Sequence, residues 1–254
     1  MKYGELADEN IEPDRAKQIK DNVRAVLDSI ALAEEQAERE KSSVSLLAAV
    51  KTRTTGEIFA ALEAGVRVIG ENRPQEIEAK RQSLQKVCAE KQLEFEYHLI
   101  GQLQTNKINK VLPYVDCIES VDSLKTAAAL SKRLESAGRE KIGVLLEVNE
   151  SAEATKSGCS PEEAFDLACE IAQIEGIELR GLMTTGMRGG GEIELRRCFS
   201  SLRELRDRLL SSKNKGTEKC VELSMGMSGD YKYAIAEGST IVRLGTVIFG
   251  PRTF

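Results

Sequence analysis

Residues 45–70, SLLAAVKTRTTGEIFAALEAGVRVIG, decide the fold of this chain. The run Ser45–Val50 is apolar enough to form a buried strand, and Thr54–Ala64 has the composition and the threonine start of a helix. The short apolar run Arg67–Gly70 follows directly and predicts a second strand. A strand, a helix and a strand in this order indicate two parallel strands joined by a crossover helix.

The same alternation continues along the rest of the chain. Six more strand-like runs, rich in Val, Ile, Leu, Phe or Tyr, occupy Phe95–Ile100, Val115–Ser120, Ile142–Val148, Leu179–Met183, Val221–Ser224 and Ile241–Leu244. Helical stretches occupy Asp14–Lys41, Pro74–Lys91, Ser123–Ala137, Pro161–Glu175, Leu195–Leu210 and Asp230–Ala236. Eight such strands predict an α/β protein: one (β/α)8 TIM barrel domain over residues 1–254, with an additional N-terminal helix.

An open, doubly wound sheet is the alternative fold. Its dinucleotide-binding form carries a G-x-G-x-x-G motif after the first strand, and no such motif follows Ser45–Val50. The glycine-rich stretch Gly186-Met-Arg-Gly-Gly-Gly191 comes only after the sixth strand, where we expect a mobile loop. The barrel is therefore favoured.

The composition excludes several classes of protein. The formal net charge is -5, with both signs mixed along the chain, so there is no basic stripe for nucleic acid. The N-terminus is acidic without an apolar stretch, and no run of about eighteen apolar residues occurs, which predicts no membrane association and a cytoplasmic location. The six cysteines form no C-x-x-C pair, so we expect reduced, mostly buried thiols and no metal site.

The single histidine, His98, restricts the chemistry. Ser-His-Asp, Cys-His and multi-histidine metal sites would all need this one residue, and no motif supplies its partners. Two roles remain open: a histidine at a strand end that bonds to the backbone, and a contact to a ligand.

Catalytic and binding residues of a (β/α)8 barrel lie at the C-terminal ends of its strands. The first strand ends in Lys51, which points to the same side as Leu47 and Ala49 on period-two counting. If that side is the interior, the amine is partly desolvated, and a neutral amine can attack an aldehyde. A surface lysine at a strand end is the alternative.

The loops after the seventh and eighth strands resemble a phosphate site. Barrels commonly bind phosphate there, and Ser224, Gly226 and Ser228 could surround an anion with Gly245 and Thr246 closing the other side. A Ser/Gly turn with a serine cap explains either loop alone, but two such loops on adjacent strands favour phosphate. Arg243 lies within the apolar eighth strand and needs a partner, for which a bound ligand is one candidate.

These residues belong to motifs that occur in the same order in a known family. The motifs are Ala49-Val-Lys-Thr52, Gly70-Glu-Asn72 with Gln75-Glu76, Tyr97-His-Leu-Ile-Gly-Gln-Leu-Gln-Thr-Asn-Lys107, Val148-Asn149 with Thr155-Lys-Ser-Gly158, Arg180-Gly-Leu-Met-Thr184, Leu223-Ser-Met-Gly-Met-Ser228 and Val242-Arg-Leu-Gly-Thr-Val-Ile-Phe-Gly250. Over nearly its whole length the chain resembles the pyridoxal phosphate homeostasis protein family, whose fold is that of the alanine racemase N-terminal domain.

The resemblance implies a pyridoxal 5′-phosphate (PLP) site. Lys51 would form a Schiff base with the cofactor, Asn72 would lie beside it, and Arg243 would face the pyridine nitrogen. The implied phosphate neighbours are Ser224, Gly226, Met227, Ser228, Gly245 and Thr246. The departures from the family pattern are small: Ala49 replaces a frequent serine, Ile69 replaces a frequent phenylalanine, and Arg73-Pro74 replaces an aromatic residue after Asn72.

The resemblance also implies a role in vitamin B6 homeostasis without catalytic turnover. The protein would bind and buffer PLP, and pass it to PLP-dependent apoenzymes as a cytoplasmic monomer. A PLP-dependent amino-acid racemase is the alternative, but it needs a second base, which alanine racemases take from a tyrosine and a C-terminal domain. The sequence ends at Phe254, shortly after the eighth strand, so we expect no such domain.

A Schiff-base aldolase is a third candidate, since it would also combine a lysine with a phosphate site. Its lysine is expected on the sixth strand, and the run Leu179–Thr185 contains none.

Overall fold

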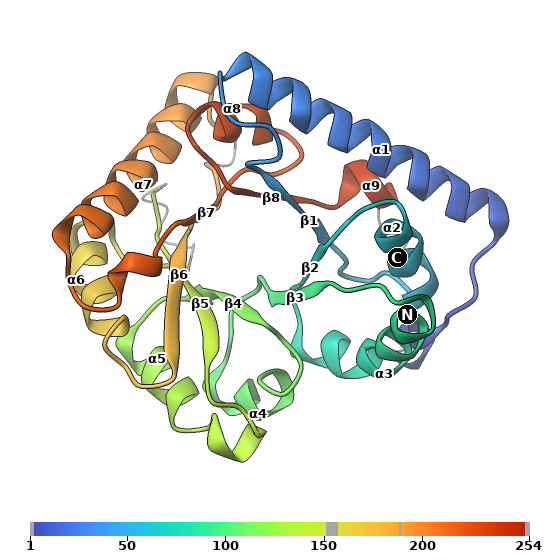
Figure 1. Ribbon diagram of the computed structural model, residues 1–254, viewed down its shortest axis with the longest axis horizontal. Coiled ribbons are helices and arrows are strands. Elements are labelled where there is room, and N and C mark those ends of the chain that lie inside the picture. Colours follow the sequence, from blue (N-terminus) through green and yellow to red (C-terminus); the bar gives the residue numbers. More distant parts are fainter. Residues whose placement is uncertain (1–2, 151–156, 188, 252–254) are drawn as a thin grey trace.

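The computed structural model describes residues 3–150, 157–187 and 189–251. These residues form eight strands that close into one barrel in chain order (Figure 1). The strands are β1 (Ser45–Ala49), β2 (Val68–Glu71), β3 (Glu96–Leu99), β4 (Cys117–Val121), β5 (Ile142–Glu147), β6 (Ile177–Met183), β7 (Glu222–Ser224) and β8 (Ile241–Leu244). All neighbouring strands are parallel, and β1 pairs with β8, placing Leu47 opposite Arg243. The predicted barrel is confirmed.

Helices surround the barrel. They are α1 (Pro13–Gln36), α2 (Thr55–Glu63), α3 (Pro74–Lys91), α4 (Ile108–Val111), α5 (Leu124–Ser131), α6 (Pro161–Ile171), α7 (Glu192–Ser212), α8 (Tyr231–Ala236) and α9 (Thr246–Phe249). Short 3-10 helices occupy Tyr3–Ala7, Thr105–Lys107, Glu135–Ala137 and Thr217–Lys219. The apolar core fills the layer between these helices and the strands.

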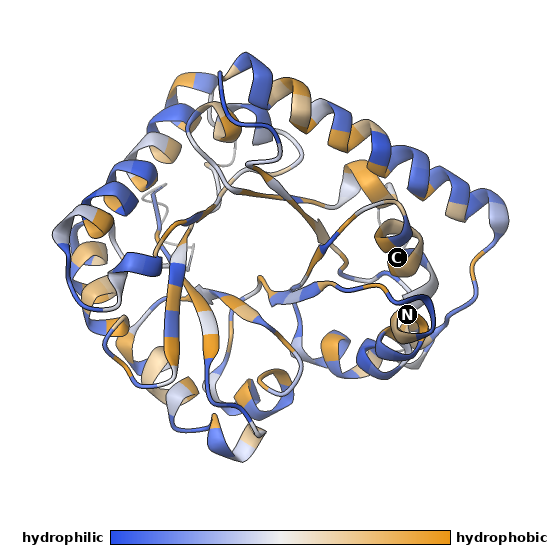
Figure 2. Ribbon diagram, in the orientation of Figure 1, coloured by the Kyte–Doolittle hydropathy of each residue, from blue (hydrophilic) through white to orange (hydrophobic). Residues whose placement is uncertain are grey.

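The additional N-terminal helix is present as α1. It buries Ile19, Val23 and Ile30, which recur at helical spacing, and packs against α2, α8 and α9 (Figure 1). Its other side is hydrophilic, and Figure 2 shows alternating hydrophobic and hydrophilic bands along α1 and α7. The outer ring therefore presents polar residues to solvent and apolar residues to the barrel.

The structure differs from the sequence expectations in a few elements. Helices α4 and α9 were not predicted, because four residues are too few to show a helical period. The predicted helix Ser123–Ala137 is interrupted: α5 ends at Ser131, and a separate 3-10 turn covers Glu135–Ala137.

The six cysteines agree with the expectation of free thiols, and all but Cys169 are buried.

Candidate functional site

A cavity of about 340 Å³ opens at the C-terminal ends of the strands. Residues that follow β1, β2, β3, β6, β7 and β8 contribute to its wall. The lining residues are Ala49, Lys51, Arg53, Asn72, Ile100, Thr185, Met227, Ser228, Gly229, Arg243, Gly245, Thr246 and Gly250. The cavity thus lies at the end of the barrel where the active sites of (β/α)8 enzymes are found.

Seven of the nine residues predicted from the sequence meet in this cavity: Lys51, Asn72, Met227, Ser228, Arg243, Gly245 and Thr246. Ser224 and Gly226 do not line it. Ser224 is fully buried, and its hydroxyl donates to Glu119 Oε2 (2.6 Å) and accepts from Arg243 Nη1 (2.7 Å). Gly226 is buried against α8. Direct phosphate contact by these two residues stays a prediction.

The cavity wall also contains residues that the sequence motifs do not predict. Arg53 is buried, and its Nη2 donates to the carbonyl of Gly250 (2.8 Å), which ties the loop after β1 to the end of α9. Thr185, after β6, and Ile100, after β3, also reach the cavity. A signal was available for all three residues, since Arg53 and Thr185 follow the C-terminal ends of predicted strands and Ile100 is the last residue of one.

Lys51 lies in a tight turn at the end of β1. The carbonyl of Val50 accepts a hydrogen bond from the N–H of Arg53 (3.0 Å), and Thr52 has a positive φ of 64°. The Lys51 side chain is half-buried and borders the cavity. Lys51 therefore borders the same cavity as Ala49, with which strand periodicity groups it.

Arg243 forms part of the cavity wall from within β8. Its guanidinium donates to the carbonyl and hydroxyl of Ser224 (both 2.7 Å) and to the carbonyl of Thr184 (2.8 Å). Burial lowers the pKa of Arg243, and the carboxylate of Glu119, 3.9 Å away, opposes this effect. Among the described residues, three of its five N–H donors have partners, which leaves two for a ligand.

A chain of hydrogen bonds continues from Arg243 down the barrel interior. Glu119 on β4 accepts from Ser224 on β7, and because these strands are not neighbours, the bond crosses the interior. Glu119 Oε1 also bonds His98 Nδ1 (2.7 Å), and His98 Nε2 bonds Glu96 Oε2 (3.0 Å). His98 therefore bonds two carboxylates and does not line the cavity, which differs from both roles left open by the sequence, a bond to the backbone and a contact to a ligand.

These contacts determine which side chains of the hydrogen-bonded series are charged. Burial lowers the pKa of His98, but the hydrogen bonds to Glu119 and Glu96 outweigh it and raise the pKa to about 9. Burial also raises the pKa of Glu119, yet His98 and Arg243 bring it below its ordinary value. The interior thus alternates negative and positive charges from Glu96 to Arg243.

The loop between β7 and α8 packs closely against α8 and borders the cavity through Met227, Ser228 and Gly229. Gly226 has a φ of 96°, and a Cβ there would come within 2.7 Å of Ala234. The N–H of Met227 donates to Asp230 Oδ1 (2.6 Å). Among the described residues, the N–H groups of Ser228 and Gly229 find no acceptor. These two donors are therefore available to an anion.

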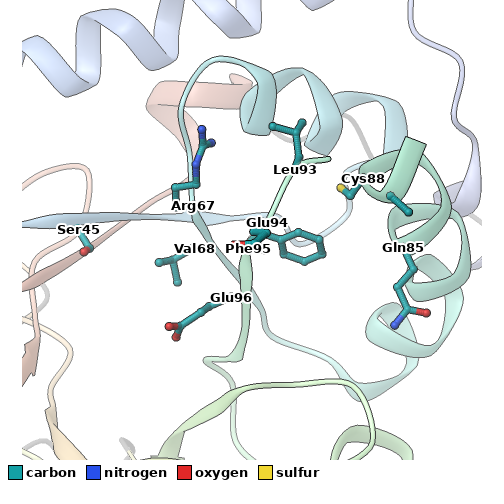
Figure 3. Close-up of a pocket in the computed structure, with 10 residues that line it drawn as sticks. Ser45, Arg67, Val68, Gln85, Cys88, Leu93, Glu94, Phe95 and Glu96 are labelled. Atoms are coloured by element: carbon teal, nitrogen blue, oxygen red, sulfur yellow. The ribbon is translucent and has the colours of Figure 1, made fainter. Parts of the chain in front are cut away.

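A larger cavity, of about 820 Å³, lies at the opposite end of the strands (Figure 3). Its wall includes Ser45, Val68 and Glu96, the first residues of β1, β2 and β3. Barrels use this end for stability rather than chemistry. Glu96 is already bonded to His98 and Arg180, so we assign the candidate site to the smaller cavity.

Comparison with known proteins shows the family of this chain. Residues 13–253 match the family model of the alanine racemase N-terminal domain. The pyridoxal phosphate homeostasis protein of Pseudomonas aeruginosa is 38% identical over 236 residues, which cover 93% of this chain and 96% of that protein. This chain belongs to the pyridoxal phosphate homeostasis protein family.

Solved structures agree with membership of the pyridoxal phosphate homeostasis protein family. An unknown protein from Bifidobacterium adolescentis superposes with a TM-score of 0.94 and 56% identity, covering 96% of this chain and all of that one. PipY of Synechococcus elongatus, in a structure with PLP bound, gives a TM-score of 0.73 and 31% identity, covering 87% of this chain and all of PipY.

Most family motifs lie in the described part of the chain. Thr155 and Lys156 of the fourth motif, and Arg188 of the glycine-rich stretch, lie outside the described residues. Of the departures from the family pattern, Ala49 lines the cavity, whereas Ile69 is buried in the core.

In the described ranges, no helix is long and apolar enough to span a bilayer.

Proposed function

We propose that this chain binds PLP in the cavity at the C-terminal end of the barrel, attached to Lys51 as a Schiff base. The observation that carries the proposal is the convergence of Lys51, Arg243 and the Ser228–Gly229 and Gly245–Thr246 loops on one cavity. PipY, a relative of the same fold, has been solved with PLP bound.

The residues present fit this cofactor. Lys51 offers an amine, and the N–H groups of Ser228 and Gly229 and the Thr246 hydroxyl offer donors to a phosphate. The Asn72 Oδ1 atom is buried and has no hydrogen-bond partner among the described residues, so a ligand donor would satisfy it. When bound, PLP supplies an aldehyde and an electron-withdrawing ring.

Arg243 orients the ring and limits its chemistry. Its cationic N–H groups can donate to an unprotonated pyridine nitrogen, which makes the ring a weaker electron sink than a partner aspartate would. Ser224 and Thr184 fix the guanidinium, so the partner of the nitrogen is held in one orientation.

We further propose a role in PLP homeostasis without turnover, as a single-domain, cytoplasmic, monomeric carrier that delivers PLP to apoenzymes. A racemase is the competing function, and it needs a base on each face of the ring. The described residues that line the cavity include no tyrosine, histidine or carboxylate, and this favours the carrier.

The first test is spectroscopic. We expect the purified protein incubated with PLP to gain the visible absorbance of a Schiff base, and borohydride followed by peptide mass mapping to locate the adduct on Lys51. Lys51→Ala should lose the adduct and keep its unfolding free energy, since the side chain is half-buried at a cavity edge rather than packed in the core.

Lys86→Ala is the matched control, because Lys86 is an exposed lysine paired with Glu9 on the surface. An adduct that persists in Lys51→Ala would show that another residue carries the cofactor. Amino-acid turnover assays separate the two functions. If the wild type racemises amino acids and Lys51→Ala does not, the protein is a racemase and the carrier proposal is wrong.

A further inference from the structure

Three ionisable side chains are buried beside the turn that carries Lys51. Glu71 ends β2, and Glu76 and Lys80 lie on α3. Lys80 Nζ donates to Glu71 Oε2 (2.7 Å) and to Glu76 Oε2 (3.3 Å). At most 2% of each residue is exposed. We call Glu71, Glu76 and Lys80 the buried triad.

The buried triad bonds the backbone on both sides of Lys51. Lys80 Nζ donates to the carbonyl of Val50 (2.9 Å), the residue before the lysine. Glu76 Oε2 accepts from the N–H of Thr52 (2.6 Å), the residue after it. Two charge-assisted hydrogen bonds therefore hold the peptide groups that flank Lys51.

The turn held in this way has a strained residue. Thr52 is the third residue of the turn closed by Val50 and Arg53, and its φ of 64° is the positive value that a type II turn requires there. Glycine and asparagine are preferred at this position, and a β-branched residue is disfavoured. Surrounding contacts must hold such a residue in place, and the Glu76 carboxylate is one of them.

Burying the triad costs more free energy than burying apolar side chains of the same volume would. Removing charges from water is unfavourable, and apolar residues of similar volume would often be as stable or more stable. The directed bonds to Val50 and Thr52 are what apolar residues would not provide.

We propose that Glu76 and Lys80 are positioning residues that hold the turn around Lys51 so that its amine faces the cavity and PLP. This inference rests on the proposed function, because it concerns the attachment of PLP to Lys51. It predicts that the triad affects the covalent attachment and not the recognition of the ring and phosphate, which other loops provide.

The test compares two ligands. PLP can react with Lys51, whereas pyridoxamine 5′-phosphate has the ring and phosphate but no aldehyde. For Glu76→Gln we expect the Kd for PLP to rise about tenfold, as for one lost charge-assisted hydrogen bond. The Kd for pyridoxamine 5′-phosphate should stay within about twofold, and less PLP should be fixed on Lys51 by borohydride.

Three further variants make the test specific. Thr52→Gly in the Glu76→Gln background should restore much of the PLP affinity, because glycine adopts positive φ without the help of Glu76. Glu78→Gln is the matched control, since Glu78 is exposed on the same helix and pairs with Lys110. Glu76→Asp, which keeps the charge beside Lys80 but shortens its reach, replaces Glu76→Gln if that variant does not fold.

The outcomes are distinct. Equal weakening of both ligands, an equal effect of Glu78→Gln, or no recovery with Thr52→Gly would overturn the positioning role. Unchanged PLP attachment in both Glu76 variants would also overturn it and leave the proposed function intact. A wild-type protein that takes up no PLP on Lys51 would overturn both.

Discussion

Arg243 illustrates how far a single residue can be interpreted from the sequence. An arginine among Ile241, Val242 and Leu244 indicates a buried charge that needs a partner. The structure provides protein partners for three of its N–H groups and leaves the cavity side for a ligand. The identity of those partners depends on strand register, which the sequence alone does not define.

Other residues of the site could not be interpreted in this way. Glu76 and Lys80 are spaced like an ordinary surface ion pair on a helix, and nothing in their spacing indicates complete burial. The same holds for Glu119, whose partners His98 and Ser224 come from two other strands. Only the folded barrel brings such residues together.

Thr246 is the residue whose hydroxyl we expect to matter for the phosphate. Thr246→Val keeps the side-chain shape and removes the hydroxyl. The Kd for PLP should therefore rise about tenfold to a hundredfold, as for the loss of a hydrogen bond to a charged group. Thr246 is exposed at the start of α9, so the unfolding free energy should not change. Isothermal titration and chemical denaturation measure the two quantities.

Val247→Thr is the reciprocal control, because Val247 is adjacent and exposed but does not line the cavity. Equal PLP affinity in Thr246→Val and the wild type would remove Thr246 from the phosphate site.

At the scale of elements, the sequence predicts strands better than short helices. All eight strand-like runs overlap strands of the barrel, because a buried parallel strand needs a continuous apolar run. Helix α7 begins at Glu192, before the predicted Leu195, because its first turn is acidic and exposed rather than apolar. Acidic residues suit the first turn of a helix, so this boundary depends on capping more than on burial.

The loop from β7 to α8 provides a prediction at this scale. Gly226→Ala would place a Cβ 2.7 Å from Ala234 Cβ and 2.9 Å from Tyr231 Cα, on a residue with positive φ. We expect the unfolding free energy to fall by about 1–3 kcal/mol, and PLP affinity to fall as well, because the loop with Ser228 must move away from α8.

Gly229→Ala is the control for stability in the same loop, since a Cβ there meets no atom within 4 Å. The denaturation midpoint should be lower for Gly226→Ala alone. A Gly226→Ala protein as stable as the wild type would mean that the loop does not depend on glycine at this position.

At the scale of the whole molecule, the barrel interior is held together by charge as well as by apolar packing. Arg180 on β6 bonds Glu222 on β7 (2.7 Å) and Glu96 on β3 (3.1 Å), and Glu96 bonds His98. The absence of a side chain at Gly143 leaves room for Arg180, since a Cβ there would lie 2.6 Å from its Cδ. Three strands, β3, β6 and β7, are therefore joined through Arg180, and Glu96 connects this group to the buried His98.

This network predicts how stability depends on pH. The pKa of His98 is about 9 in the folded chain and 6.5 for an unperturbed histidine. The folded state thus keeps a proton that the unfolded state loses, so the stabilisation is complete below pH 6.5 and is lost as pH rises to about 9. At about 1.36 kcal/mol per pH unit, the loss for this buried group is on the order of 3 kcal/mol.

The measurement is the unfolding free energy by denaturant between about pH 6 and pH 9.5, for the wild type and for His98→Gln. Buried thiols such as Cys88, whose pKa burial raises to about 11, also destabilise the fold at high pH, but they are common to both proteins. The difference between the two curves therefore isolates His98 and should shrink steadily across this window. Parallel curves would show that His98 is neutral in the folded barrel, and the alternating charges between Glu96 and Arg243 would then lack their central cation.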